Sequence, residues 1–457
     1  MRKRVFLAWL LVVAMAVATG CSLIVKDAEV DKQTVIIDVA GKTYTKGEIT
    51  PMVQNTLDYQ EYMYSMYYGQ RFDKTSSEAV SSAQDSVISS LIQEAVLESK
   101  QAEKGMNVFT DEELATMKTT AESTRQNYID AVKKSDFAET QLTGEELDKA
   151  VEDKMAEYGY PTLDELVEQA KTTAATDKLK AEVVKDVTVS EDELQTEYNT
   201  HVENAKTEYA ATPATYGTAV TSGTTVYYVP AGYRYVKHIL LKFADEDNTK
   251  ISDLNSQISD KQTQLTNVEA SLTDLGEDEG KDDEQTAQNR KELTDTQTTL
   301  KTEIADLQSQ LDQVKEAAYA VLEPKAAEIE EKLALEGSDF DALMAEYGQD
   351  PGMQSEPAKT NGYPVCATST NWVAEFRDGA MALAKIGDVS QPVRTSMGLH
   401  IIKYVGDATE GPVAYEDVKD TLQSEMLTSK QDELYNTTVE QWVSEANAKI
   451  YKDRLAD

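Results

Sequence analysis

The chain has 457 residues, with 82 Asp and Glu against 44 Lys and Arg, and its formal net charge is −38. This length predicts two or three domains, since single hydrophobic cores stop growing at about 250–300 residues. The charge argues against nucleic acid as a partner and against adsorption to an anionic membrane surface, because both need clusters of Lys and Arg. With three His and two Cys in the whole chain, a multi-cysteine zinc site and a disulfide framework are excluded.

The amino terminus has the layout of an export signal. Three basic residues at positions 2–4 precede an apolar run over 5–17 that is too short for a comfortable transmembrane helix. The following Ala-Thr-Gly-Cys string, which ends at Cys21, resembles a bacterial lipobox, in which the cysteine is acylated. We expect a lipoprotein signal peptide over 1–20, lipidation of Cys21 and a polar tether over 21–33. An ordinary signal peptide with a coincidental Cys is the alternative.

A mostly helical region is predicted over 34–210. Two short strands meet at a turn at Gly41-Lys42, and Thr110 and Ser190 each precede a Glu by three residues, the spacing of a helix capping box. Helical spacing of apolar residues predicts helices over 47–68, 77–104, 110–136, 143–158, 162–186 and 190–210.

Residues 211–232 are rich in Thr, Gly, Ala and Pro and predict a linker.

Residues 251–316 predict an antiparallel coiled-coil hairpin. Two runs with apolar residues at alternating three- and four-residue spacings flank an acidic, Gly-containing stretch over 276–284. Each arm would be roughly 35–40 Å long. The hairpin could be a rigid spacer, an oligomer contact or a clamp for clients, and pairing within or between chains stays open. The acidic stretch lacks an EF-hand pattern and is expected to be a solvated loop.

The carboxy-terminal part mixes strands and helices. An alternating strand is predicted over 233–243, ahead of the hairpin, and further strands lie around 392–393 and 400–404. Helices are predicted from Lys325 to Leu335 after Pro324, up to Tyr347, over 371–384, and in one amphipathic region over 414–455.

Residues 233–245 and 317–405, taken together without the coiled coil, resemble a parvulin-type peptidyl-prolyl isomerase domain. The opening strand contains His238-Ile-Leu, and the later motifs follow in the order and spacing of that family. These motifs are Gly337-Ser-Asp-Phe340, Tyr347-Gly-Gln-Asp350, Phe376, Gly387-Asp-Val-Ser390-Gln-Pro-Val393 and Thr395-Ser-Met-Gly398-Leu-His400.

The flanking regions look like the chaperone lobe of exported foldases related to PrsA and SurA, and the lipobox makes PrsA the closer of the two. The resemblance implies an α+β fold. Its parts would be a helical chaperone lobe over 34–210, completed by a carboxy-terminal helix within 406–457, and a parvulin domain over 233–405. The parvulin domain would contain an antiparallel sheet with helices and be interrupted by the hairpin over 251–316.

Isomerisation of an X–Pro bond requires few specialised catalytic groups. An X–Pro bond rotates over a barrier of about 18–20 kcal/mol, which takes tens of seconds or more without a catalyst. Rotation needs no covalent intermediate, and we expect no cofactor and no metal. The catalyst must hold the proline ring in an apolar pocket and stabilise an amide that has lost its resonance.

The resemblance implies a site built on paired imidazoles. His238 and His400 would form its floor, with Asp350 and Thr395 completing the hydrogen-bonded set. Two of the chain's three His occupy the family's two His positions. Alternatively, the histidines could be structural and Asp350 could only cap a turn, while His201 is expected to be a surface residue. The implied substrate-binding residues are Trp372, Phe376, Met381 and Met397, with Phe376 lining the proline pocket.

Three features depart from the family pattern. The Gly-rich segment usual after the Asp350 position reads Lys359-Thr-Asn-Gly362-Tyr-Pro-Val-Cys366 and keeps one Gly. Trp372 replaces a smaller residue and could narrow the pocket, and Met397 occupies an often polar position. Cys366 is expected to be a small packed residue rather than a nucleophile.

The sequence favours an extracytoplasmic foldase at the bacterial cell membrane, anchored by lipid, that isomerises X–Pro bonds in unfolded or partly folded exported polypeptides. One alternative is a holdase with a weak or inactive parvulin domain, and another is a coiled-coil adapter for a secretion or envelope partner. A homodimer is left open. Residues 57–72 contain five Tyr and two Met, which suit either a packed helix face or an adaptable client surface.

Overall fold

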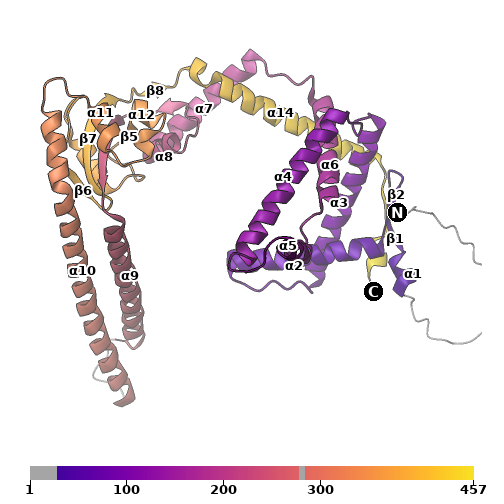
Figure 1. Cartoon of the computed structure of the whole chain (residues 1–457), viewed down its shortest axis with the longest axis horizontal. Helices are drawn as coiled ribbons and strands as arrows, with labels where there is room; N and C mark the ends of the chain where they lie inside the picture. Colours follow the sequence, from indigo (N-terminus) through magenta and orange to yellow (C-terminus); the bar gives the residue numbers. More distant parts are fainter. Residues whose placement is uncertain (1–27, 277–283, 457) are drawn as a thin grey trace, which may run out of the picture. The chain divides into compact units, whose positions relative to one another are not determined.

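The computed structural model describes residues 28–276 and 284–456 (Figure 1). The predicted signal peptide and Cys21 lie outside the described residues. The chain divides into two units, Met1–Thr188 with Leu427–Asp457, and Val189–Met426. The predicted α+β class is confirmed, because helices dominate and an antiparallel sheet lies in the second unit. In the described part of the chain, none of the helices combines the length and hydrophobicity needed to cross a bilayer.

The first unit contains a small sheet with strand order β2-β1-β9 and a set of helices. A capping box forms at Thr110 as predicted, and Thr45 and Thr162 add two more, whereas the one predicted at Ser190 forms in the second unit. The elements of this unit are α1 (Ala28–Lys32), β1 (Val35–Val39), β2 (Lys42–Thr45), α2 (Lys46–Tyr68), α3 (Ser77–Glu103), α4 (Asp111–Asp136), α5 (Glu145–Glu157), α6 (Leu163–Val184), β9 (Lys449–Ile450) and the 3₁₀ helix η2 (Lys452–Leu455).

The end of the chain differs from the single helical region predicted over 414–455. Helix α14 (Tyr415–Glu445) stops, and strand β9 then pairs antiparallel with β1. Asn447 has a left-handed φ of 46° in the connecting turn, a conformation that asparagine tolerates better than most residues. Local periodicity does not reveal this strand, because its backbone partners Ile37 and Asp38 lie about 410 residues earlier.

Helix α2 packs through its first half only. Ile49, Val53 and Leu57 are buried in a cluster with α3 and the small sheet. Its second half is largely exposed, which does not agree with the packed helix face that was one of the two alternatives for residues 57–72. Five of its apolar or aromatic side chains are 62–70% exposed, namely Tyr59, Tyr62, Met66, Tyr67 and Tyr68.

The second unit is built on a four-stranded antiparallel sheet with strand order β5-β4-β7-β6. Its described elements before the hairpin are α7 (Glu191–Ala211), α8 (Ala214–Thr221), β3 (Tyr228–Val229) and β4 (Arg234–Lys242). The hairpin and the elements after it are α9 (Asp245–Asp274), α10 (Glu284–Leu333), α11 (Phe340–Tyr347), η1 (Gly352–Gln354), α12 (Ala358–Asn361), β5 (Tyr363–Val365), α13 (Ala374–Ala382), β6 (Val393–Thr395), β7 (Gly398–Asp407) and β8 (Gly411–Pro412).

The predicted linker over 211–232 contains the helix α8. Tyr216 on this helix is 1% exposed, and its hydroxyl lies 3.1 Å from that of Tyr235 on β4. Gly217 donates its N–H to the Tyr233 hydroxyl, and a side chain at this glycine would meet the same ring. Composition predicts only a linker, but small residues here serve close packing of a helix on the sheet.

The coiled coil pairs within the chain, since α9 and α10 lie side by side (Figure 1). Ion pairs join the arms at Lys261 and Glu303, 2.7 Å apart, and at Lys301 and Glu269, 3.3 Å apart. The helix predicted from Lys325 to Leu335 is not separate from the hairpin, because α10 continues through Pro324 to Leu333. The proline removes one backbone donor, but the helix is buried against the sheet on both sides of it.

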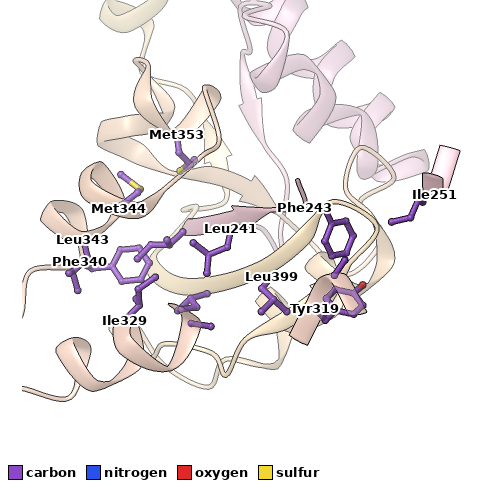
Figure 2. Close-up of a cluster of buried hydrophobic side chains, with 14 of the residues drawn as sticks. Leu241, Phe243, Ile251, Tyr319, Ile329, Phe340, Leu343, Met344, Met353 and Leu399 are labelled. Atoms are coloured by element: carbon purple, nitrogen blue, oxygen red, sulfur yellow. The ribbon is translucent and has the colours of Figure 1, made fainter. Parts of the chain in front are cut away.

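The sheet has two faces of different character. On one face, Ile239 and Leu241 of β4 lie opposite Ile401 and Leu399 of β7. These four side chains belong to one apolar cluster with residues of α10 and α11. Figure 2 shows Leu241 and Leu399 with Phe243, Tyr319 and Ile329 in this cluster. Ile251 of α9 belongs to the same cluster, so the base of the hairpin is part of the domain core. The opposite face carries the histidines.

Candidate active site

The register of β4 and β7 places two histidines on one face of the sheet. His238 lies opposite Ile402, and His400 lies opposite Leu240, so the two imidazoles are diagonal neighbours across the strand pair. Their ring centroids are 5.0 Å apart, and both side chains are buried. Because β-strand side chains alternate, this polar pair shares its strands with the apolar face described above.

A continuous chain of hydrogen bonds connects the four predicted polar residues. Nδ1 of His238 lies 3.1 Å from Nδ1 of His400, and Nε2 of His238 lies 2.9 Å from Oδ2 of Asp350. At the other end, Nε2 of His400 lies 2.9 Å from Oγ1 of Thr395. The Thr395 hydroxyl also accepts the backbone N–H of Met397 at 3.1 Å. The structure therefore brings together four residues that are spread over more than 160 positions of the chain.

Asp350 has two further donors that the sequence did not reveal. The Tyr363 hydroxyl donates to its Oδ2 at 2.9 Å, and the Gly352 N–H donates to its Oδ1 at 3.1 Å. A Cβ at Gly352 would lie 1.9 Å from the Tyr363 oxygen, so only glycine permits this approach. Asp350 does cap the turn before Gly352, and it also holds His238.

Tyr363 follows the one glycine retained from the Gly-rich segment. Gly362 has a φ of 83°, and a Cβ there would lie 2.7 Å from the Val236 carbonyl oxygen. The glycine thus lets β5 start close against β4, which places Tyr363 beside Asp350. The Gly-Tyr-Pro string is the available sequence signal, but as a departure from the family's Gly-rich segment it does not by itself predict a site residue.

The charges of this chain of residues are set by burial and by the hydrogen bonds. Burial alone would raise the pKa of Asp350, but bonds from His238, Tyr363 and Gly352 hold it at about 2. Burial and the neighbouring His238 lower the pKa of His400 to about 3. At neutral pH, the site therefore contains an ionised Asp350 and a neutral His400.

Both nitrogens of each ring are engaged in this chain of hydrogen bonds. His400 binds Thr395 through Nε2 and His238 through Nδ1, and His238 binds Asp350 through Nε2. Every ring nitrogen therefore has one partner. A histidine in this arrangement has no free nitrogen to attack or deprotonate a substrate. The pair can only position its neighbours and form a fixed polar floor.

Two aromatic side chains, Phe376 and Trp372, lie next to the histidine pair and are called the aromatic wall below. Phe376 of α13 is 2% exposed, and its ring lies edge-on to both His238 and His400, at 5.0 and 5.2 Å. The Trp372 ring lies 5.5 Å from Phe376 and 4.6 Å from Tyr363, and its N–H donates to the Pro364 carbonyl. Trp372 is therefore fixed in place on two sides.

The two predicted methionines are placed differently. Met381 is partly buried in the cluster that contains Phe376 and Trp372. Met397 lies in the turn between β6 and β7, and its side chain is 46% exposed. Its backbone N–H binds Thr395, so the contact given by the structure is through the main chain.

The remaining chemical groups lie elsewhere. Cys366 is buried with Tyr209, Tyr216 and Tyr233. His201 of α7 stacks on Tyr227 at 4.4 Å and is not near the pair. Among residues 28–276 and 284–456, no three His, Cys, Asp or Glu side chains are grouped to hold a metal ion.

Residues 309–406 match the family model described as "Rotamase: PPIC-type PPIASE domain". The match leaves out β4, which the hairpin separates from the rest of the sheet. The fold and the matched segment define this part of the chain as a parvulin-type peptidyl-prolyl isomerase domain.

The whole chain is also similar to foldases. It is 23% identical over 434 residues to Foldase protein PrsA of Clostridium acetobutylicum, and the matched region covers 94% of this chain and 92% of that relative. A segment of 136 residues is 35% identical to Foldase protein PrsA of a Geobacillus strain, covering 30% of this chain and 46% of the relative. These findings support a PrsA-like parvulin foldase with peptidyl-prolyl isomerase function.

The chain is also similar to foldases of known structure. It is 19% identical to PrsA from Bacillus subtilis, with a TM-score of 0.20, and the similarity covers 91% of this chain and 92% of that chain. PrsA from Bacillus cereus shares 16% identity with a TM-score of 0.19, over 93% and 97%.

Proposed function

We propose that His238, His400, Asp350 and Thr395 form the floor on which the foldase isomerises X–Pro bonds of exported polypeptides. The observation that carries the proposal is the continuous chain of hydrogen bonds next to Phe376. Phe376, with Trp372 and Met381 beside it, would hold the proline ring.

The proposed catalysis is non-covalent. A planar amide has more charge separation than a twisted one. An apolar environment therefore raises the free energy of the planar ground state more than that of the twisted transition state, which lowers the barrier. The aromatic wall supplies that surrounding, and the fixed polar floor supplies hydrogen-bonding groups that need no reorganisation during the reaction. Neither step requires a free histidine nitrogen, which agrees with the full use of both rings.

The test is cis–trans exchange of a proline peptide with the wild-type chain and with Asp350→Asn. Removing the charge that holds His238 should reduce kcat/KM by about 100-fold. Asp341→Asn is the matched control, because Asp341 binds Lys237 at 2.8 Å from the other face of β4. No acceleration by the wild-type chain with any tested proline peptide would remove the isomerase proposal.

A second proposal concerns the exposed half of α2. We infer that the aromatic stripe, defined as Tyr59, Tyr62, Met66, Tyr67 and Tyr68, binds unfolded segments of clients. Tyr and Met offer large contact areas without a strict shape, and contiguous exposed apolar surface is typical of interaction sites. Such a surface would also suit a holdase.

Changing Met66, Tyr67 and Tyr68 to Ser should weaken suppression of client aggregation several-fold. Three scattered exposed residues of the same unit, Val30, Val108 and Leu142, changed to Ser serve as the control. Equal suppression by the stripe variant and the wild type would overturn this proposal. Aggregation suppression should be unchanged by Asp350→Asn.

We also propose lipid attachment at Cys21 and a position on the extracytoplasmic side of a bacterial membrane. The lipobox-like string and the similarity to PrsA foldases support it. Fatty-acid labelling should be lost in Cys21→Ala, and labelling that persists would contradict it. A homodimer, which the sequence leaves open, would need a surface other than the hairpin seam, because α9 and α10 fill that seam with each other.

A further inference from the structure

The second arm of the hairpin and the first helix after it are one helix. Helix α10 runs unbroken from Glu284 to Leu333, and its buried side chains change partners along the way. Leu300 is buried in the part of the helix that pairs with α9, whereas Tyr319 and Ile329 pack in the core of the domain. Any displacement of the arm's base is therefore a displacement of a helix that lies against the sheet.

Helix α10 holds strand β6 at one position. The buried Tyr319 hydroxyl donates to the backbone carbonyl of Thr395 at 2.7 Å. The adjacent Arg394 binds Glu316 at 2.8 Å and Glu323 at 2.6 Å, and its guanidinium lies 4.6 Å above the Tyr319 ring. The three helix residues are three and four positions apart, so they present one face to β6.

Thr395 thus has partners on two sides. Its carbonyl is held by Tyr319, and its hydroxyl binds His400 at 2.9 Å. The residue is 1% exposed and ends β6 at a tight turn, where a Cβ at Gly398 would lie 2.0 Å from the Leu241 carbonyl oxygen. Because Thr395 has so little conformational freedom, the orientation of its hydroxyl depends on where its backbone is fixed.

We propose that Tyr319 is a positioning residue for the isomerase site. It fixes the backbone of Thr395 and thereby the hydrogen bond from the Thr395 hydroxyl to His400, which couples the base of the coiled-coil hairpin to the site. This inference rests on the proposed function of the four-residue floor.

The test is Tyr319→Phe, which removes only the hydroxyl. Loss of one positioning hydrogen bond should lower kcat/KM for a proline peptide about fivefold, with the loss in kcat rather than KM. Tyr198→Phe is the matched control. Tyr198 also donates a hydrogen bond to a backbone carbonyl of the same unit, that of Val413 at 2.6 Å, and lies outside the site.

A second readout does not depend on activity. The chain has three His, so ring ¹⁵N resonances can be assigned directly. Tyr319→Phe should shift the resonances of His400 and leave those of His201 in place, while Tyr198→Phe should leave His400 unchanged. Unaltered His400 resonances in Tyr319→Phe would overturn the inference, as would equal losses of activity in both variants. An inactive wild type would defeat the proposed function, and the His400 shift would still decide whether Tyr319 positions the floor.

Discussion

The two faces of the four-stranded sheet use the same strands for different purposes. Ile239 and Ile401 point into an apolar core, while their sequence neighbours His238 and His400 form the polar floor. The apolar face derives its stability from burial, in proportion to the area removed from water. The buried polar groups of the other face lose their hydrogen bonds to water, and this free-energy cost is offset only if each group has a hydrogen-bond partner in the protein. Neighbouring residues should therefore differ in whether their loss affects folding or activity.

The largest expected effect is on the apolar face. Ile401→Ala removes a side chain with no exposed surface and should destabilise the second unit by about 2–5 kcal/mol, since a cavity remains. Native-state hydrogen exchange at β4 and β7 amides measures this loss. Val321→Ala, at a site that is 73% exposed on α10, should cost less than about 0.5 kcal/mol. Similar losses in the two variants would contradict the account.

The polar face should make stability depend on pH. The pKa of His400 falls from 6.5 to about 3 on folding, so the unfolded chain binds more protons between these values. Stability should therefore decrease as pH falls from 6.5 towards 3, by up to a few kcal/mol. Asp350, with a pKa lowered from 3.8 to about 2, adds a further loss below 3.8.

The variant His400→Gln isolates this effect. Its stability should change less between pH 6.5 and 3 than that of the wild type, measured by denaturant unfolding at each pH. His201→Gln, on the surface of α7, should keep the wild-type dependence. An identical slope in His400→Gln and the wild type would show that His400 is not the neutral buried group described above.

A smaller effect is expected from Tyr363→Phe, which removes one donor from Asp350. The second unit should lose about 1 kcal/mol, and the pKa of Asp350 should rise above its value of about 2, as followed by ¹³C NMR of the carboxyl group. Tyr235→Phe removes a hydroxyl from β4 that does not reach Asp350 and is the control. A pKa unchanged in Tyr363→Phe would remove Tyr363 from the site.

The smallest effect is expected in the arms of the hairpin, away from both faces. Lys261→Ala breaks an ion pair with Glu303 whose two side chains are partly exposed. Such pairs contribute about 0–1 kcal/mol, and the isomerase rate should not change. A rate loss of tenfold would show that the arms, as well as their base, act on the site.

Local patterns predicted much of this molecule. Capping boxes at Thr110 and Ser190, heptads in the hairpin and the existence of strand β4 each depend on residues near in sequence, so one stretch is enough to identify them. The alternation expected in β4 is wrong, because residues 236–241 are buried on both faces of the sheet. The two histidines could be paired only through the family resemblance, because their contact spans 162 positions.

The features that were missed depend on distant partners. Tyr363 reaches Asp350 only because Gly352 and Gly362 allow close backbone approach. Strand β9 exists because β1 offers it a free edge, and α10 passes Pro324 because the core holds the helix on both sides. In each case tertiary packing overrides the local signal.

The most direct test compares the isomerisation rates of two variants at adjacent positions of β7, each per folded molecule. His400→Ala should lose most of the kcat/KM for cis–trans exchange of a proline peptide, because the chain of hydrogen bonds is opened. Ile401→Ala should keep nearly the wild-type value for the fraction that remains folded. Equal activity in the two variants, or a greater loss in Ile401→Ala, would contradict the assignment of catalysis to the polar face.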